Sequence, residues 1–178
     1  NLLRLGKWQA TLGRAQGVVE PMPVIDQLLS LEGSIRIDEK SGFGCVKKLQ
    51  FPPMALCYET SFDLKTDCAL TFAMEPGAIC GDASIFINDT EITSLLTTRR
   101  VYARGNLACD ITPFVRPGKN TVRVTVSAQM DHDGLVNALY IAGAFSCWQR
   151  QGIWTLEPPA QAGSMLDLPG CGLPFYCG

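Results

Sequence analysis

Histidine is almost absent from this sequence, and its scarcity limits the chemistry that the chain can perform. The only histidine, His132, sits between two aspartates in a polar segment. A serine or cysteine nucleophile needs a neighbouring base, and His132 is the sole imidazole that could serve. The sequence also contains no Cys-x-x-Cys pair, so a zinc site of the Cys/His type is not expected. No catalytic constellation of these classes is indicated.

Long apolar runs and clusters of basic residues are missing as well. No hydrophobic stretch approaches the roughly 20 residues that cross a bilayer, and the first residues do not have the pattern of a signal peptide. The 15 lysine and arginine residues are balanced by 17 acidic residues, which leaves a net charge of −2. We therefore expect neither a membrane nor a nucleic acid among the partners. Because the sequence starts at Asn1 without methionine, a mature form or an excised domain is expected.

Eight cysteines are present, an even number that would allow a framework of disulfides. The chain is long for such a framework, however, and it has apolar strands of its own. Cys57 and Cys68 lie within or beside predicted strands, where a free cysteine behaves as a small hydrophobic residue. We therefore predict that most cysteines are reduced thiols, which mildly favours a cytoplasmic location. The eight are Cys45, Cys57, Cys68, Cys80, Cys109, Cys147, Cys171 and Cys177.

The strongest structural signal is a strand that follows a proline-glycine turn. From Thr121 to Ser127, valines at every second position alternate with polar residues, as in a half-buried β-strand. The turn before it spans Arg116 to Asn120, where proline presets φ and glycine and asparagine accept positive φ. Upstream, Asp110 to Pro113 is a polar break, and we expect the Asp110 carboxylate to cap the turn at Ile111-Thr112.

Further segments have the alternation or the β-branched content of strands. Ala55 to Leu64 alternates over its whole length, and Cys68 to Met74 and Ala83 to Asn88 follow after turn signals. Asn1 to Gln9 is predicted as an N-terminal strand and Arg99 to Ala103 as a short one. About eight strands, separated by turns every 8–12 residues and with little helix, predict an all-β fold. The expected architecture is an antiparallel β-sandwich of the jelly-roll type.

One domain and a tail account for the whole chain. The last predicted strand, Gln151 to Leu156, ends the sandwich, so residues 1–156 are assigned to the domain. Residues 157–178 open with a proline- and alanine-rich stretch typical of a linker. We expect this tail either to add an edge strand or to begin a following domain. A short helix at Val24–Leu29 and a strand at Ser34–Asp38 complete the expected elements.

Five short motifs, in this order, make the sequence similar to a known family. They are a Tyr- and Phe-bearing strand at Tyr58–Leu64, a hairpin strand at Ala83–Asn88, an Asp-Ile-Thr corner at 110–112, a Pro-Gly-Lys-Asn turn at 117–120 and a Gly-Ile-Trp segment at 152–154. The chain resembles the galactose-binding-like jelly-roll domain of glycoside hydrolases, notably the sugar-binding domain of the family 2 enzymes of β-galactosidase and β-glucuronidase type. The resemblance covers residues 1–156. One departure is Asn88-Asp89, where the family usually has Asn-Gly.

The resemblance implies an accessory role and not catalysis within this chain. In that family the two catalytic carboxylates lie on a separate (β/α)8 barrel of about 250 residues, which this chain is too short to contain. The implied protein is a bacterial, multidomain glycoside hydrolase of carbohydrate metabolism. Its accessory domain would have carbohydrate and the other domains of the same polypeptide as partners. Two alternatives stay open: an independent carbohydrate-binding module, and a jelly roll with a structural or protein-interaction role.

Sugar binding by such a domain requires an aromatic face beside hydrogen-bonding side chains. The most attractive cluster is Trp148-Gln149-Arg150, expected in a loop, where a tryptophan neighbours an amide and a guanidinium. Further candidates are Trp154, Tyr102, Arg99 and Arg100. The alternative interpretation is structural: Trp148 caps the sandwich, and Trp154 belongs to the core or packs on a neighbouring domain.

One acidic segment invites a metal interpretation. Asp131-His132-Asp133-Gly134 resembles the start of a calcium loop, but no bidentate glutamate follows at the required spacing. The simpler interpretation is an acidic, solvent-facing turn that ends in an Asp-Gly signal. We therefore expect no cofactor and no metal site, calcium being the only ion that the segment suggests.

Overall fold

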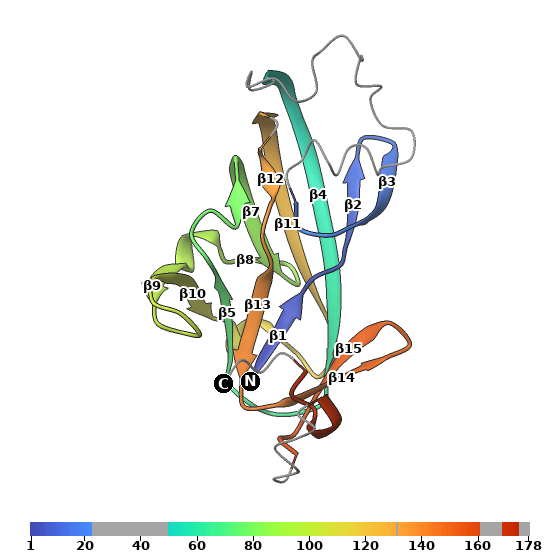
Figure 1. The fold of residues 1–178 in the computed structure, drawn as a ribbon, viewed down its shortest axis with the longest axis vertical. Coiled ribbons are helices and arrows are strands. Elements are labelled where there is room, and N and C mark those ends of the chain that lie inside the picture. The colour runs from blue at the N-terminus through green and yellow to red at the C-terminus, as the bar shows by residue number, and fades with distance from the viewer. Residues whose placement is uncertain (23–49, 131, 161–168, 175–178) are drawn as a thin grey trace.

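Two β-sheets face each other, and the hydrophobic core lies between them (Figure 1). The computed structural model describes residues 1–22, 50–130, 132–160 and 169–174, and the structural statements below refer to these residues. The helix expected at 24–29 and the strand expected at 34–38 lie outside them.

The strands divide unequally between the sheets. The smaller sheet has five strands, in the order β1 (Leu2–Leu5), β13 (Leu139–Gly143), β5 (Leu70–Met74), β10 (Asn106–Asp110) and β9 (Thr97–Arg99). The larger has eight, with the main path β14 (Ser146–Arg150), β15 (Ile153–Glu157), β4 (Gln50–Leu64), β11 (Gly118–Met130), β7 (Asp82–Ile87) and β8 (Thr90–Glu91). Its remaining strands are β2 (Trp8–Leu12), which pairs with β4, and β3 (Ala15–Val19), which pairs with β2. A separate ribbon joins β6 (Ile79–Cys80) to β12 (Gly134–Leu135), and 3-10 turns occur at Thr93–Leu95, Thr112–Phe114 and Pro169–Cys171.

The longer strands cross from sheet to sheet along the chain, as in a jelly roll. The strands β4, β7 and β11 belong to the eight-stranded sheet, whereas β5, β10 and β13, which alternate with them in sequence, belong to the five-stranded sheet. The prediction of an all-β sandwich is confirmed. Among the described strands one pairing departs from the antiparallel rule: β15 runs parallel to β4, with Trp154 opposite Phe62.

Strand β11 has the predicted alternation. The side chains of Val122, Val124 and Val126 are at most 2% exposed, whereas the polar residues between them are half-buried on the outer face. Its neighbour β4 contributes Tyr58 and Phe62, both fully buried. Burying side chains of this size stabilises a fold by about 1.5–3 kcal/mol each, so these two central strands supply much of the hydrophobic stabilisation.

The polar break before β11 is a capped corner, as predicted. Oδ1 of Asp110 accepts hydrogen bonds from the Thr112 backbone N–H over 2.9 Å and from the Thr112 hydroxyl over 2.6 Å. The Thr112 hydroxyl oxygen also accepts a hydrogen bond from the backbone N–H of Leu70 over 2.9 Å. The corner therefore joins the end of β10 to the start of β5.

Two sequence predictions about strand limits are wrong. The N-terminal strand expected at Asn1–Gln9 is broken at Gly6-Lys7, where the chain leaves the five-stranded sheet and enters the eight-stranded one. The strand expected at Arg99–Ala103 ends at Arg99. Oδ1 of Asn106 accepts a hydrogen bond from the Ala103 N–H over 2.9 Å, and Gly105 has φ of 82°, so the following residues form a turn instead.

The described part of the tail lies against β14. The carbonyl of Gly172 accepts hydrogen bonds from the Cys147 N–H over 2.8 Å and from Nδ2 of Asn1 over 3.1 Å. The backbone N–H of Ala160 donates to the Ser146 hydroxyl over 2.7 Å. Pro169–Cys171 form a 3-10 turn, and residues 169–174 contain no strand. The division at residue 156 and the role of the tail stay predictions.

Candidate functional site

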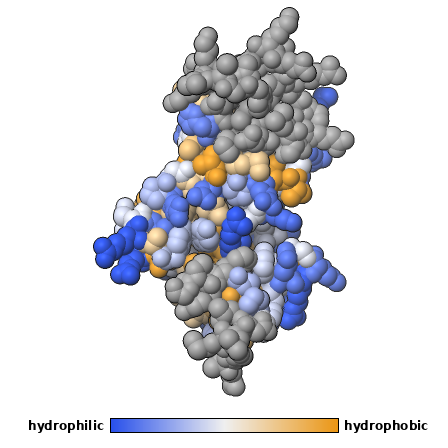
Figure 2. Space-filling model, in the orientation of Figure 1, coloured by the Kyte–Doolittle hydropathy of each residue, from blue (hydrophilic) through white to orange (hydrophobic). Residues whose placement is uncertain are grey.

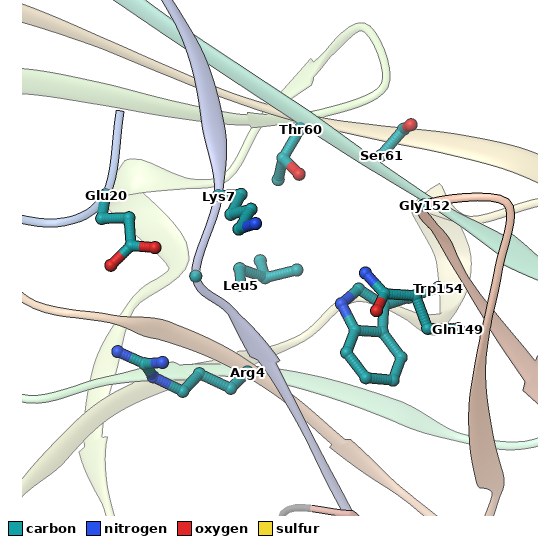
Figure 3. Close-up of a pocket in the computed structure, with 10 residues that line it drawn as sticks. Arg4, Leu5, Lys7, Glu20, Thr60, Ser61, Gln149, Gly152 and Trp154 are labelled. Atoms are coloured by element: carbon teal, nitrogen blue, oxygen red, sulfur yellow. The ribbon is translucent and has the colours of Figure 1, made fainter. Parts of the chain in front are cut away.

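A gap in the eight-stranded sheet creates the site that we consider most suited to a ligand. One edge of β4 pairs with β11 along its length, while the other edge is shared by two strands. Strand β2 pairs with Leu56–Glu59 of β4, and β15 pairs with Phe62–Leu64. Thr60 and Ser61 fall between these two pairings. A pocket of about 240 Å³ opens at this position (Figure 3).

The gap follows from the break at Gly6-Lys7. Because β1 lies in one sheet and β2 in the other, the connection between them passes over the edge of β4 without pairing with it there. Leu5, Gly6 and Lys7 form this side of the pocket. Gly6 is packed closely, since a Cβ at this position would lie 3.3 Å from Nη1 of Arg4. The sheet crossing and the pocket are therefore consequences of the same local feature.

The opposite wall is the hairpin of β14 and β15. Gln149 and Trp154 are directly opposite each other across the two strands, so both side chains lie on the same face. Gln151 and Gly152 form the connecting turn with φ of 51° and 82°, the positive values that a two-residue hairpin turn requires. Trp154 is half-buried and packs against the core. The register of the hairpin thus places an aromatic ring and an amide together beside the gap.

Thr60 lies at the pocket on the core-facing side of β4. Its side chain lies on the same face of the strand as those of Tyr58 and Phe62. Those two are fully buried, whereas Thr60 is half-buried. The gap accounts for this exposure, because no described strand pairs with this edge of β4 between the two pairings. The Thr60 side chain therefore lines the pocket together with the Gln149 amide, whereas Ser61, the next residue of the strand, points to the opposite face.

Charged residues surround the mouth of the pocket. Arg4, Lys7 and Glu20 line it, and all three are exposed. Figure 3 shows the Arg4 guanidinium on the same side as Glu20, whereas the Lys7 amine points toward the side of Trp154 and Gln149. Among the described residues, no carboxylate lies within ion-pair distance of Lys7 or Arg4. Of the described residues, two cations and one carboxylate thus line the pocket.

The predicted cluster Trp148-Gln149-Arg150 is divided by the structure. These residues belong to strand β14 and not to a loop, so successive side chains point to opposite faces. Only Gln149 faces the pocket. Arg150 forms an ion pair with Glu157, its Nη2 lying 3.0 Å from Oε1. Trp148 lies against the tail, since a Cβ on Gly172 would come within 2.9 Å of its Cζ2. The prediction of a loop is therefore wrong.

Arg99, Arg100 and Tyr102 lie apart from the pocket, near the β9 end of the five-stranded sheet. This end forms a hydrophilic projection at the left of Figure 2. Nε of Arg99 donates a hydrogen bond to the Thr97 hydroxyl over 3.0 Å. The ring of Tyr102 packs on Tyr140 with centroids 4.7 Å apart and the planes inclined at 55°. None of the three lines the pocket at the gap.

The hydroxyl of Tyr102 is buried although its ring is partly exposed. This burial raises the pKa of Tyr102 to about 12, and the negative charge of Glu75 acts in the same direction. The neighbouring Asn106 amide opposes the shift only in part, because its Nδ2 and the phenol are not in hydrogen-bond geometry. Tyr102 is therefore a neutral packing residue at ordinary pH.

The acidic segment does not present a metal site within the described residues. Asp133 is buried, and its Oδ2 accepts hydrogen bonds from the backbone N–H groups of Gln129 and Met130 over 2.7 and 2.9 Å. The expected solvent-facing position is wrong for this carboxylate, because it closes the turn after β11. Free thiols are present at Cys57, Cys68, Cys80, Cys109 and Cys147. No described helix is long and apolar enough to cross a membrane.

The sequence analysis did not select Arg4, Lys7, Glu20 and Thr60, which are among the residues that line the pocket. Arg4, Lys7 and Thr60 lie in segments interpreted as strands, and Thr60 belongs to the Tyr- and Phe-bearing motif at Tyr58–Leu64. The signal that could have located them is Gly6 followed by a charged residue in the middle of an apolar N-terminal segment. Such a glycine marks a break in a strand, and a break leaves neighbouring strands without a partner.

Comparisons with known proteins identify the fold. No protein-family model matches the sequence, and no curated protein matches it either. Among solved structures, a β-glucuronidase from an uncultured Clostridium species is 15% identical with a TM-score of 0.51, over 79% of this chain and 28% of that one. A β-D-mannosidase from Dictyoglomus thermophilum is 10% identical with a TM-score of 0.56, over 84% and 23%. An exo-chitosanase from Amycolatopsis orientalis is 14% identical with a TM-score of 0.57, over 84% and 21%.

This chain has the fold of a β-sandwich domain found in glycoside hydrolases. The resemblance that the sequence motifs predicted is confirmed at the level of the fold. The chain spans between about a fifth and a third of the glycoside hydrolases that it matches.

Proposed function

We propose that the chain is a non-catalytic, sugar-binding accessory domain of a multidomain glycoside hydrolase. The observation that supports this proposal is the asymmetry of the structural matches. They cover 84% of this chain but only 21% and 23% of the exo-chitosanase and mannosidase chains. An enzyme of this architecture has ample sequence outside the sandwich for a catalytic domain.

The pocket at the gap is suited to binding and not to glycoside cleavage. Hydrolysis of a glycosidic bond uses two carboxyl groups, about 5–5.5 Å apart in retaining enzymes and about 6.5–9.5 Å apart in inverting ones. Among the described residues, Glu20 is the only carboxylate that lines this pocket. A single carboxylate on one rim can accept hydrogen bonds from sugar hydroxyls, but it cannot provide both the acid and the base or nucleophile.

The same pocket favours a second candidate function, an independent carbohydrate-binding module. An indole face packs on the C–H groups of a sugar ring, and the amide and hydroxyl groups beside it can bond the ring hydroxyls. Trp154, Gln149 and Thr60 provide these groups on two sides of the gap. In a module, this pocket would act without a neighbouring catalytic domain.

Two measurements on the natural protein test the proposal. The coding sequence is first read beyond this chain, and an accessory domain requires a catalytic domain in the same polypeptide. The complete protein and its Gln149→Ala variant are then compared for kcat/KM on oligosaccharides and on short aryl glycosides. We expect a loss on oligosaccharides of roughly 3- to 10-fold, equal to one or two hydrogen bonds. The accessory role is contradicted if Gln149→Ala lowers kcat/KM on oligosaccharides no more than on aryl glycosides. It is also contradicted if the polypeptide has no catalytic domain.

A further inference from the structure

We propose that the pocket at the gap selects a single sugar ring that bears a carboxylate, with Lys7 as the residue that recognises the acid group. This inference rests on the proposed sugar-binding function and specifies its ligand class. It is carried by the distribution of charge around the pocket, by the position of Lys7 opposite the Trp154 wall and by the size of the cavity.

The described residues that line the pocket have a charge of opposite sign to that of the protein. The whole chain has a net charge of −2, whereas these lining residues include two cations and one carboxylate. Arg4 and Glu20 lie on the same side in Figure 3, beyond ion-pair distance of each other. Lys7 faces the other side, and no described carboxylate lies within ion-pair distance of its amine. An anionic group on the ligand would form an ion pair with the Lys7 amine.

Lys7 and Trp154 would contact different parts of such a ligand, the acid group and the sugar ring. The amine points from the β1–β2 connection toward the wall formed by Gln149 and Trp154 (Figure 3). A ring stacked on the indole would therefore direct its substituents toward the amine. A charge-assisted hydrogen bond from an ammonium to a carboxylate is about twice as strong as a neutral one, so this contact would dominate the choice between ligands.

The size of the cavity limits the ligand to about one ring. Pockets for drug-sized ligands have volumes of about 300–1,000 Å³, and this one has about 240 Å³. Neutral hydrogen-bonding groups at the pocket, from Gln149 and Thr60, suit the hydroxyls of a pyranose. An amino sugar would place its ammonium among Arg4 and Lys7, where like charges repel. An acidic monosaccharide, at the end of a chain or as a side branch, fits both the volume and the charge.

Two ligands that differ in one group test the inference. Methyl β-D-glucuronoside and methyl β-D-glucoside have the same ring, and only the first has a carboxylate. The complete 178-residue chain is titrated with each while the indole N–H resonance of Trp154 is followed by NMR. We expect the glucuronoside to bind roughly tenfold more tightly at low salt and the difference to shrink in high salt, because the added contact is ionic.

Lys7→Gln is the decisive variant, since Lys7 is exposed and its replacement leaves the core intact. We expect this variant to bind both glycosides equally, at the affinity that the unaltered protein has for the glucoside. Lys119→Gln, at an exposed position in β11 outside the pocket, is the matched control and should bind like the unaltered protein. Sodium acetate tests whether a carboxylate without a ring is sufficient, and we expect no shift of the Trp154 resonance.

Three outcomes would overturn the inference. If the glucoside binds as tightly as the glucuronoside, the proposed sugar-binding function stands and the selectivity for an acid group fails. If Lys7→Gln retains the preference for the glucuronoside, Lys7 does not recognise the acid group. If neither glycoside moves the Trp154 resonance at about 50 mM, far above the millimolar affinities of weak ligands, both the inference and sugar binding at this pocket fail.

Discussion

The side chains of Asn88 and Asn120 join two turns, the hairpin turn that follows β7 and the turn at the start of β11. Nδ2 of Asn88 donates a hydrogen bond to Oδ1 of Asn120 over 3.0 Å, and Asn120 is fully buried. Asn88 adopts φ of 52° in the hairpin turn after β7, and its Oδ1 accepts a hydrogen bond from the Thr121 N–H over 3.0 Å. The two sequence motifs that these residues belong to are therefore one connected structure.

Replacing Asn120 by alanine should destabilise the protein by about 3 kcal/mol. The Asn120 amide donates to the carbonyls of Arg116 and Gly118 over 2.7 and 2.9 Å, and its Oδ1 also accepts the Arg116 N–H over 2.9 Å. Removing this buried side chain breaks hydrogen bonds to part-buried backbone groups, each worth about 0.5–1.5 kcal/mol net. Urea unfolding measures the effect. Lys119→Ala, at the exposed neighbouring position, should change the free energy of unfolding by less than about 0.5 kcal/mol. Equal effects at the two positions would show that the Asn120 bonds are not structural.

Asp110 should add a small contribution to the free energy of unfolding, and this contribution should be lost at acid pH. Hydrogen bonds from the Thr112 hydroxyl and the Thr112 N–H hold the pKa of the Asp110 carboxyl below its usual value. Because the folded-state pKa is lowered, the stabilisation is present above the ordinary pKa of about 4 and disappears as the pH falls through the lower folded value. The carboxylate is exposed, so solvent screening limits the term to at most about 0.5 kcal/mol.

Asp110→Asn tests this pH dependence, since an amide oxygen can still accept the Thr112 N–H but does not titrate. Free energies of unfolding at pH 7 and pH 3 should differ less in this variant than in the unaltered protein. Asp82→Asn, at an exposed position in β7, serves as the control. If both variants change the difference equally, the Asp110–Thr112 contact is not its source.

Tyr102 should ionise well above the ordinary pKa of a tyrosine. Burial raises the pKa of its phenol to about 12, and the negative charge of Glu75 adds to the effect. A raised folded-state pKa means that the neutral phenol favours the folded state fully below the ordinary value of about 10, and this contribution is lost between about 10 and 12. Absorbance at the tyrosinate band should show a late transition that Tyr102→Phe removes. A transition that persists in this variant would assign it to another tyrosine.

The fold could be predicted from the sequence because its signals are local. The valine alternation in β11 is set by a period of two, and the capped corner at Asp110-Ile111-Thr112 is formed by neighbouring residues. The gap beside Thr60 could not be predicted in this way. It depends on where β2 leaves β4 and where β15 joins it, two pairings between segments that are distant in sequence.

The candidate site was predicted only in part for the same reason. Trp154 and Gln149 were selected by residue type, and they meet because the turn at Gln151-Gly152 sets their register. Trp148 and Arg150 were selected on the same grounds, but a strand directs them to the opposite face. Treating this segment as a loop concealed that alternation. Arg4 and Lys7 could be connected to the site only after the crossing at Gly6 was known.

Gly172→Ala should detach the described tail from β14. A Cβ at this position would lie 2.7 Å from Cβ of Ser146 and 2.9 Å from Cζ2 of Trp148, and Gly172 has φ of 73°. Both the contact and the backbone conformation disfavour a side chain, the latter by about 1–2 kcal/mol. Gly152→Ala is the matched control, because it has φ of 82° but nothing within 4 Å of the added Cβ. The two variants therefore differ in the contact and share the backbone cost.

We expect Gly172→Ala to red-shift the tryptophan fluorescence, since Trp148 loses its cover, and to lower the melting temperature by several degrees more than Gly152→Ala does. Replacing Trp148 by phenylalanine in the Gly172→Ala background should remove the fluorescence change and leave the effect on stability. Limited proteolysis within residues 157–178 should be faster in Gly172→Ala than in Gly152→Ala. If the two glycine variants melt together and are cleaved at the same rate, the tail contributes nothing to the sandwich and behaves as the linker that its composition predicts.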